Sequence, residues 1–354
     1  MVPKKAQRKP TVDVRVHQFS EIWLRGWNSF IEALPEATLA HAGSWLSVIP
    51  RALGHEDRSL IAERAGEVCG ILPMMLLSHW LLGTFHVSLP WLDYGGIIAR
   101  DPETCQHLLQ AAIAQAKLDG ASFIELRSVD TLQPDLPTRD DKVKLLLQLG
   151  ETDGVWRRMD PKVRNQVRKA TRSGLSCEFG QEELLGDFYQ VFSQNMRDLG
   201  TPVWGIELFH TILAAFPKES EIAVVRQGNN PIAAGVTIAF RDTVAMPSAS
   251  ALRKFRPLCP NNLLYWEVIK RACEKGYRQF DFGRSTVGSG TCHFKRQWGP
   301  RVERLPWQYV LLKRKDIPRL NPSNPRLRLC IELWKRMPVG LATWLGPRIV
   351  HHLP

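Results

Sequence analysis

The sequence predicts a mixed α/β (α+β) fold of two similar units, each with a mixed central sheet flanked by helices, and a helical C-terminal tail. Two predicted strand hairpins turn at Gly66 and Gly228, and the helix after each opens similarly, at His107 and at Asn262. A glycine and similar strands, 123–128 and 280–285, follow these helices. The offsets are about 155 to 162 residues, so we expect a duplicated unit, with chance similarity as the alternative.

Hydrophobic periodicity assigns the individual elements. In the first half it predicts helices over 19–34, 41–50 and 103–118, and strands over 59–63, 68–77, 85–91, 122–127 and 143–149. In the second half it predicts helices over 162–173, 182–199, 205–216 and 262–275, a hairpin over 221–240, and strands over 243–250, 279–282 and 302–312. We therefore predict a basic flexible tail over 1–15, domains over 16–155 and 156–312 with the active site in the second, and a basic amphipathic helical tail over 313–354.

The net charge of +12 on 354 residues is concentrated in the tails. Residues 1–10 carry four Lys/Arg and no acid, and residues 313–354 carry nine Lys/Arg and two acids. Seven scattered cysteines without CxxC spacing argue against a disulfide framework and for a reducing compartment. The sequence has no run of eighteen apolar residues and no apolar signal segment. We expect a cytoplasmic protein, with basic tails suited to the inner face of the cytoplasmic membrane.

The segment 276–299 holds the densest group of candidate catalytic residues. Asp281 lies at the carboxyl end of a predicted strand and Arg284 just after it, and α/β folds hold ligands at such strand ends. Lys295 lies farther on, where a cation could stabilise negative charge that develops on a carbonyl oxygen. The alternatives are a structural ion pair between Asp281 and Arg284 and an ordinary surface lysine.

The basic run 157–172 is a second candidate, with seven Lys/Arg and one acid. Arg164, Arg168 and Arg172 recur at helical spacing, and such stacked like charges are unfavourable without an anion. We predict that these arginines and Lys169 bind phosphate, with a solvated helix face as the alternative. In the C-terminal tail, an amphipathic, basic and Trp-bearing pattern fits either an anionic membrane or docking on the protein itself.

The sequence lacks the residues needed for a cysteine nucleophile, for the common nucleotide-binding motifs and for a metal site. Cys292 and His293 are adjacent in sequence, so their side chains point apart and cannot form a nucleophile–base pair. The segment 283–289 has no Walker lysine, and the chain has no GxGxxG motif. No histidine spacing typical of a metal site occurs within the globular part, so no metal is predicted.

Six segments resemble the FemAB-like branch of the GNAT (acyl-CoA N-acyltransferase) superfamily, and more narrowly the FemAB-related proteins of PEP-CTERM and exopolysaccharide gene clusters. They are SLPWLDYGG (88–96), RMDPKVRNQVRKATRSGL (158–175), NMRDLGTPVWG (195–205), PNNLLYWEVIKRA (260–272), FDFGRST (280–286) and FKRQWG (294–299). The resemblance runs from about residue 20 to 312. It implies two tandem GNAT-like domains and no tightly bound cofactor, with acyl-CoA or aminoacyl-tRNA as the co-substrate.

The resemblance also implies residue roles. The family's Phe-Lys motif, whose lysine is thought to stabilise the tetrahedral oxyanion, matches Phe294-Lys295. The family carries an Arg/Lys-rich segment where this chain has its basic run, so a tRNA 3′ end, CoA or a nucleotide-linked acceptor would contact it. The sequence has neither the coiled-coil arm of some members nor the pyrophosphate loop of ordinary GNAT enzymes, which leaves the acyl donor open.

We therefore expect an N-acyltransferase that acts on an amine of a cell-envelope or exopolysaccharide precursor, a saccharide or a peptide. Lys295 is expected to stabilise the oxyanion, and Asp281 or Arg284 to orient the acceptor. The residues expected to contact substrate come from the matched motifs: Asp93, Tyr94, Trp204, Asn261, Asn262, Ser285, Phe294 and Trp298. The main alternative is a non-catalytic binding module at the membrane face, and a weaker one is a nucleic-acid-binding protein.

Overall fold

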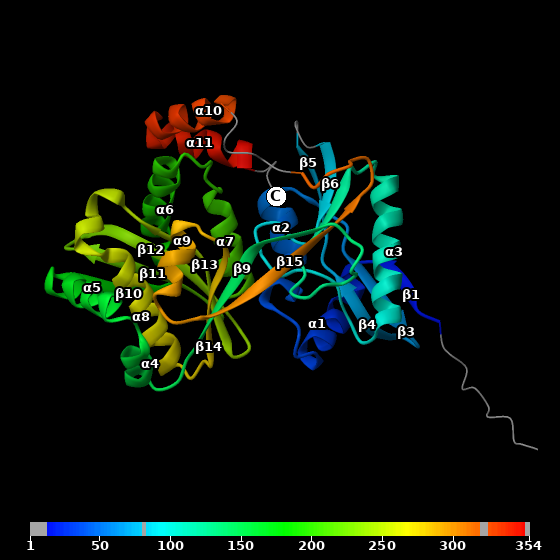
Figure 1. Ribbon diagram of the computed structural model, residues 1–354, viewed down its shortest axis with the longest axis horizontal. Helices are drawn as coiled ribbons and strands as arrows, with labels where there is room; N and C mark the ends of the chain where they lie inside the picture. Colours follow the sequence, from blue (N-terminus) through cyan, green and yellow to red (C-terminus); the bar gives the residue numbers. More distant parts are fainter. Residues whose placement is uncertain (1–12, 80–82, 319–324, 351–354) are drawn as a thin grey trace, which may run out of the picture.

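The computed structural model describes residues 13–79, 83–318 and 325–350, and it shows two α/β halves that share one sheet (Figure 1). The first half contains β1 (Arg15–Gln18), α1 (Leu24–Ala33), α2 (Trp45–Leu53), β2 (Glu56–Asp57), β3 (Leu60–Arg64), β4 (Glu67–Leu72), β5 (Met75–His79), β6 (Gly83–Val87), β7 (Ile98–Ala99), α3 (Pro102–Leu118), β8 (Phe123–Leu126) and β9 (Thr138–Gln148). The second contains α4 (Thr152–Arg158), α5 (Pro161–Arg172), β10 (Leu175–Gly180), α6 (Leu185–Leu199), α7 (Ile206–Ala215), β11 (Ser220–Gln227), β12 (Asn230–Phe240), β13 (Thr243–Ala251), α8 (Pro260–Glu274), β14 (Gln279–Thr286), α9 (Gly290–Arg296) and β15 (Arg301–Leu311). Two further helices, α10 (Pro325–Arg336) and α11 (Val339–Val350), follow.

The topology confirms the predicted duplication. The large sheet has the strand order β10-β11-β12-β13-β14-β9-β15-β8-β6-β5-β2, and a smaller sheet has the order β1-β3-β4-β7. Each half contains one parallel strand pair, β6 with β8 and β13 with β14. A helix connects the two strands of each pair, α3 in the first half and α8 in the second, because parallel strands need a crossover connection. An antiparallel strand then follows in the sheet, β15 beside β8 and β9 beside β14.

Two strands lie beyond the half to which they belong in sequence. β9 of the first half pairs with β14 of the second, and β15, which runs between the two halves in Figure 1, pairs with both β8 and β9. The predicted domains 16–155 and 156–312 therefore share one continuous sheet. The predicted flexible tail falls mostly outside the described residues, and β1 already begins at Arg15.

Helices cover both faces of the second half. On one face α5 and α8 pack together, and Val163, Val167 and Ala170 recur at helical spacing on the buried side of α5. On the other face α6 packs on β12, and its apolar cluster continues into the first half through Trp27 and Trp45. In the first half, α3 packs on β3 and β4.

The main differences from the predicted elements concern the segment after Asp281. The predicted strand 279–282 is too short, because residues Arg284–Thr286 continue β14 by pairing with residues 142–144 of β9. The expected loop that follows contains α9, whose first turn is capped by the Ser289 hydroxyl accepting from the Cys292 N–H (3.2 Å). Strands β1 and β10 and helix α4 were also not predicted.

The predicted C-terminal helices are present. α10 and α11 lie at the top of the molecule in Figure 1 and pack on α6, with Trp334, Ala342 and Val350 buried. Across the described ranges, no helix has both the length and the apolar character that a bilayer crossing requires.

Candidate active site

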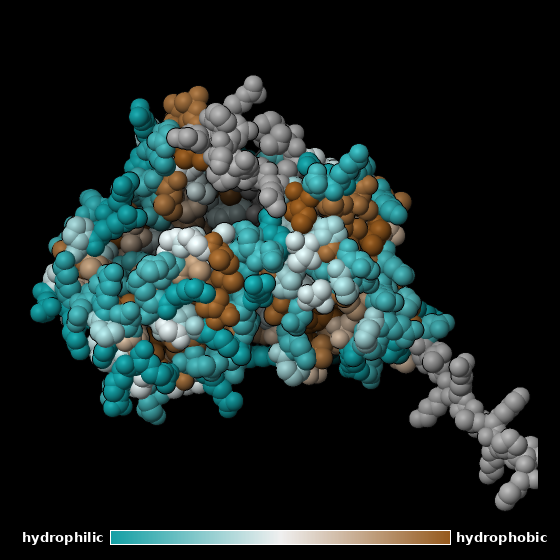
Figure 2. Space-filling view, viewed as in Figure 1, coloured by the Kyte–Doolittle hydropathy of each residue, from teal (hydrophilic) through white to brown (hydrophobic). Residues whose placement is uncertain are grey.

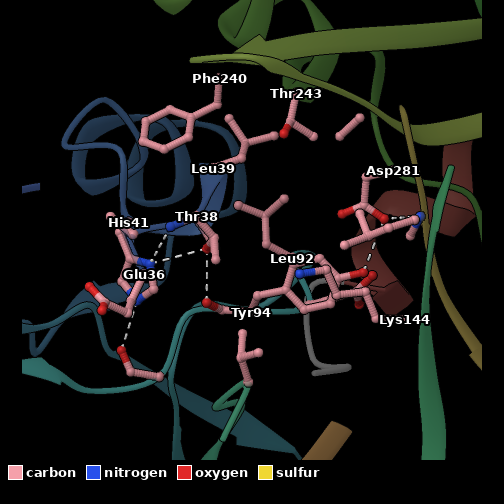
Figure 3. Close-up of a pocket in the computed structure, with 18 of the residues that line it drawn as sticks. Glu36, Thr38, Leu39, His41, Leu92, Tyr94, Lys144, Phe240, Thr243 and Asp281 are labelled. Carbon is pink, nitrogen blue, oxygen red and sulfur yellow. Dashed lines mark hydrogen bonds between the residues drawn. The ribbon is translucent and has the colours of Figure 1, made fainter. Parts of the chain in front are cut away.

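A cavity of about 490 Å³ lies between the two halves. The first half contributes the loops 35–41 and 92–98 and part of β9, and the second half contributes β12, β13 and β14. Figure 3 shows Asp281 and Lys144 on one side of the cavity and Thr38 and His41 on the other, with Tyr94 between them. This volume suits a small molecule or one end of a larger one, which makes the cavity the candidate active site.

The two parallel strands of the second half separate at this cavity. Their pairing ends at Ala245 on β13 and Asp281 on β14. Immediately afterwards β13 bulges, because Met246 and Pro247 together oppose a single residue of β12, and both line the cavity. The cavity therefore reaches the gap between the diverging strands.

Asp281 is the most strongly perturbed acid on the cavity wall, and only 6% of it is exposed. β14 bulges after it at Gly283, whose φ of +69° is readily adopted by glycine alone. The Gly283 N–H donates to Asp281 Oδ1 (2.7 Å), and the Tyr94 hydroxyl donates to the same oxygen (3.3 Å). Burial raises the pKa of Asp281 to about 6, although the nearby Lys144 cation opposes the shift. A carboxyl with such a pKa suits a general base near neutral pH.

The loop that carries Asp93 and Tyr94 has a strained backbone and is held in place by hydrogen bonds from Arg127. Leu89 and Trp91 both have left-handed backbones, with φ of +63° and +70°, which costs energy in residues other than glycine. The buried Arg127 guanidinium donates to the carbonyls of Leu89 (3.3 Å) and Leu92 (2.7 Å). These bonds fix the loop in the conformation that brings Tyr94 to Asp281.

Arg127 is itself part of a buried polar network. It pairs with Glu125 (2.8 Å), and the Tyr309 hydroxyl of β15 donates to the same carboxylate (2.9 Å). Burial would raise the pKa of Glu125, but the cation and the two hydrogen bonds hold it below its usual range. Glu125 is therefore an anion that orients Arg127.

Asp93 and Arg284 connect the halves beside the cavity. The Arg284 Nε donates to Asp93 Oδ1 (2.6 Å), and the Arg284 N–H donates to Oδ2 (3.2 Å). The Lys295 ammonium donates to the Arg284 carbonyl (2.9 Å), and burial lowers the pKa of Lys295 against the opposing effect of Asp93 and Asp281. Lys295 does not line the cavity, so the expectation that its ammonium faces an open cavity is corrected. Its ammonium is bonded to the carbonyl of Arg284, the residue after the cavity-lining Gly283.

Four of the residues expected to contact substrate pack elsewhere. Phe294 and Trp298 belong to an aromatic cluster with Tyr265, with ring centroids 5.2 and 5.8 Å from it, and Trp298 is only 1% exposed. Trp204 packs in the apolar cluster beside Tyr189. Ser285 is buried, and its hydroxyl has no partner among the described residues. Burial in these clusters stabilises large aromatic side chains, which explains the placement of Phe294, Trp298 and Trp204.

The two asparagines and the basic run lie on a different part of the second half. Asn261 and Asn262 are in the first turn of α8, and the Asn262 amide donates to Gln166 of α5 (3.1 Å). The four predicted phosphate ligands are all on α5, and none lines the cavity: Arg164, Arg168, Lys169 and Arg172. The Arg168 guanidinium lies over the Trp156 ring (5.5 Å), and the Arg164 Nε is buried without a partner in the described chain.

Several cavity residues were not predicted. Lys144 lies on β9, with its ammonium 5.1 Å from the centroid of the Tyr94 ring. Ser128 is 4% exposed, lines the cavity, and has no hydrogen-bond partner for its hydroxyl within the described ranges. The sequence signal that could have predicted Ser128 is its position in the repeated strand ending, which is equivalent to that of Ser285 in the second repeat.

His41 also lines the cavity, but its contacts make it structural. Its Nδ1 accepts from the Thr38 N–H (3.0 Å), so Nε2 carries the proton and donates to the Gly96 carbonyl (2.9 Å). Burial lowers its pKa to about 4, which keeps the ring neutral at physiological pH. In the described chain, no group of three or more His, Cys, Asp or Glu side chains could hold a metal ion.

Comparisons with known proteins agree with this architecture. Residues 157–296 match the family described as "Acetyltransferase (GNAT) domain". The crystal structure of FemX aligns over 84% of this chain and 98% of its own, with a TM-score of 0.64 and 15% identity. L-PGS from Bacillus licheniformis aligns over 90% and 98% (TM-score 0.53, 17% identity), and a tandem GNAT protein from the clavulanic acid biosynthesis pathway over 86% and 100% (TM-score 0.53, 11% identity).

No curated protein sequence matches the chain. The similar solved structures show the fold of this chain. The match of residues 157–296 to the GNAT domain family indicates acyl transfer as the class of reaction. The GNAT domain covers the diverging strands β13 and β14, Asp281 and Lys295. Residues 157–296 therefore form a GNAT acetyltransferase-type domain, within a chain whose fold is similar to that of FemX.

Proposed function

We propose that the protein transfers an acyl or aminoacyl group to an amine of a cell-envelope or exopolysaccharide precursor, with Asp281 as the general base. The observation that carries this proposal is a buried carboxyl on the cavity wall whose pKa is about 6. At neutral pH this carboxyl is mostly ionised, and it can accept a proton from the acceptor ammonium before the attack or from the amine nitrogen during it.

The charges that line the cavity favour a cationic acceptor. Five acids are among the lining residues, and only two Lys/Arg: Glu36, Asp93, Asp130, Asp242 and Asp281 against Lys144 and Arg241. The Arg241 guanidinium is held by the carbonyls of Ile31 and Pro35. Asp93 is paired with Arg284, so four acids remain against Lys144 and Arg241, and an amine that enters as an ammonium would be attracted by this field.

In the reaction, the acceptor nitrogen forms a bond to the donor carbonyl carbon, and the C–S bond of a thioester or the C–O bond of an aminoacyl ester breaks. Asp281 takes the proton that the nitrogen loses, and the leaving thiolate or alkoxide finally receives it. Lys295 supplies the positive charge for the oxyanion at the edge of the cavity, since its bond to the Arg284 carbonyl uses one of three N–H groups. The Ser128 hydroxyl is available to hold the acceptor.

For the donor we propose acyl-CoA or aminoacyl-tRNA, with its phosphates on the basic face of α5. The separation of this cationic helix from the acidic cavity supports two binding regions, one for each substrate. The fold is shared with FemX and with the C-terminal domain of a putative lysylphosphatidylglycerol synthetase from Agrobacterium fabrum (TM-score 0.53, 12% identity, 82% of this chain and 91% of that chain). The likeness to a putative lysylphosphatidylglycerol synthetase supports an envelope-related acceptor.

The experiment is an assay of the purified protein with acetyl-CoA, longer acyl-CoAs and aminoacyl-tRNA against a panel of amino sugars, UDP-amino sugars and diamines, followed by mass spectrometry of the products. We expect an N-acylated product from at least one pair, and its loss in Asp281→Asn. Binding of an acceptor without transfer from any donor would support the non-catalytic module instead.

A further inference from the structure

The C-terminal helix pair has one face against the protein and one face outward. Trp334, Ala342 and Val350 are buried against the rest of the chain. Gly346 approaches Val203 so closely that a Cβ there would lie 2.8 Å from the valine backbone nitrogen. This close packing on the loop after α6 fixes the rotation of α11 and hence which residues point to solvent.

The outward face is strongly apolar. Leu329 and Leu333 of α10 are 62% and 60% exposed, and Leu341 and Trp344 of α11 are 47% and 59% exposed. Their spacings of four and three residues place each pair on one side of its helix. Figure 2 shows hydrophobic atoms at the top of the molecule, where Figure 1 places these helices.

Exposed large hydrophobic residues are concentrated in this region. Five of the ten in the described chain lie on the two helices, Ile349 being the fifth. Two more, Leu199 and Ile206, adjoin glycines that contact the helix pair, Gly200 at Ile331 and Gly205 at Pro347. A clustered apolar surface of this kind marks an interaction site rather than the usual scatter of single residues.

The surrounding charge is positive. Residues 325–350 contain five Lys/Arg and one acid, and that acid, Glu332, pairs with Lys335 (2.7 Å). Arg336 and Arg348 have exposed side chains, and the Arg348 guanidinium lies 4.3 Å from the centroid of the Trp344 ring. Leucines and a tryptophan bordered by cations are the composition of helices that lie in the interface of a bilayer.

We propose that this face, defined by Leu329, Leu333, Leu341, Trp344 and Ile349, binds the surface of an anionic phospholipid bilayer. Each helix has 12 residues, or about 18 Å at 1.5 Å per residue, which is too short to cross the membrane. The pair therefore lies along the interface. A second copy of the chain is disfavoured as the occupant, because a symmetric contact would bring two basic faces together. The proposal does not depend on the transfer reaction.

The test is co-sedimentation of the full-length protein with phosphatidylcholine vesicles and with phosphatidylcholine–phosphatidylglycerol vesicles. The double variant Leu333→Ser/Trp344→Ser removes apolar contact, Arg336→Gln/Arg348→Gln removes charge, and Ile22→Ser is the control, since Ile22 is 84% exposed outside this surface. Circular dichroism melting verifies that each variant folds.

The wild type and Ile22→Ser should bind the anionic vesicles and should bind the neutral ones only weakly. Both proteins should dissociate from the anionic vesicles as the salt concentration rises. Each double variant should bind at least about tenfold more weakly, as expected from the loss of two apolar anchors or two charges. Equal binding to both vesicle types, or unchanged binding by the double variants, would overturn the proposal. So would a wild-type dimer that Leu333→Ser/Trp344→Ser dissociates, because that result assigns the face to self-association.

Discussion

Arg127 and Arg284 place their guanidinium groups over the same indole ring, that of Trp307, at 4.6 and 4.8 Å from its centroid. They occupy equivalent positions in the two repeated strand endings, but their tasks have diverged. Arg127 holds the carbonyls of the loop that carries Asp93, and Arg284 pairs with Asp93 itself. The repeats thus meet at β15 and build a single site from two similar segments.

Replacement of Asp281 by asparagine should lower kcat/KM by about 10²- to 10⁴-fold, the range for loss of a general base. In the wild type, kcat/KM should rise with pH through about 6 as the carboxyl ionises, and the variant should lack this rise. Measurement of pH–rate profiles for both proteins checks this, and an unchanged acidic limb in Asp281→Asn would assign it to another group.

The same residue should make stability depend on pH. Because its folded pKa is raised from 3.8 to about 6, the native state binds the proton more tightly than the unfolded state. The contribution of Asp281 to the free energy of unfolding therefore falls as pH rises from about 4 to about 6. Thermal melts at pH 5 and 8 should show a smaller drop in Asp281→Asn than in the wild type.

Lys295→Met should remove most of the transfer activity while it leaves the fold intact, since the methionine chain can replace the buried stem. Burial lowers the pKa of Lys295, so the wild-type activity should decline on the alkaline side below the usual lysine range, as the oxyanion loses its cation. Arg296→Met on the exposed side of α9 is the matched control. Full activity in Lys295→Met would exclude the oxyanion role.

Gly283→Ala should cost about 1–2 kcal/mol, the penalty for a left-handed backbone at an L-residue. It should also reduce activity, because the Gly283 N–H positions Asp281. Gly228→Ala has the same backbone strain, with φ of +56°, in an open hairpin turn. Chemical denaturation should show similar losses for both variants, whereas only Gly283→Ala should lose turnover.

Arg127→Met should destabilise the protein by about 3–5 kcal/mol, because it leaves the Glu125 carboxylate buried without its cation. The double variant Glu125→Met/Arg127→Met should recover part of this loss. Urea denaturation of the wild type, Arg127→Met, Glu125→Met and the double variant measures the coupling. A double variant as unstable as the sum of the two single variants would show that the pair does not act as a unit.

Conversion of Arg164, Arg168, Lys169 and Arg172 to glutamine should raise KM for a phosphate-bearing donor by about tenfold or more and flatten its dependence on salt. KM for the acceptor should stay constant, because none of the four lines the cavity. Steady-state kinetics at two salt concentrations checks this, and an equal rise in both KM values would contradict separate binding regions.

The sequence was sufficient to predict the duplication, most elements and the group around Asp281. Local periodicity determines a helix such as α8. A strand end predicted Asp281 and Arg284 as site residues, and the segment 88–96 predicted Asp93 and Tyr94, which the structure places beside them. The contribution of Lys144 was not predictable, because it depends on β9 pairing with a strand of the other half. The sequence predicts Phe294 and Trp298 at the substrate because they belong to a matched motif, and only the packing shows that their rings lie in an aromatic cluster.

The exchange of β9 and β15 means that the duplicated units are no longer separable modules. A fragment that ends near residue 155 would present an unpaired edge on β8, and the complementary fragment would lack the neighbour of β14. Such open edges invite aggregation, so co-expression of both pieces is the condition under which either should become soluble.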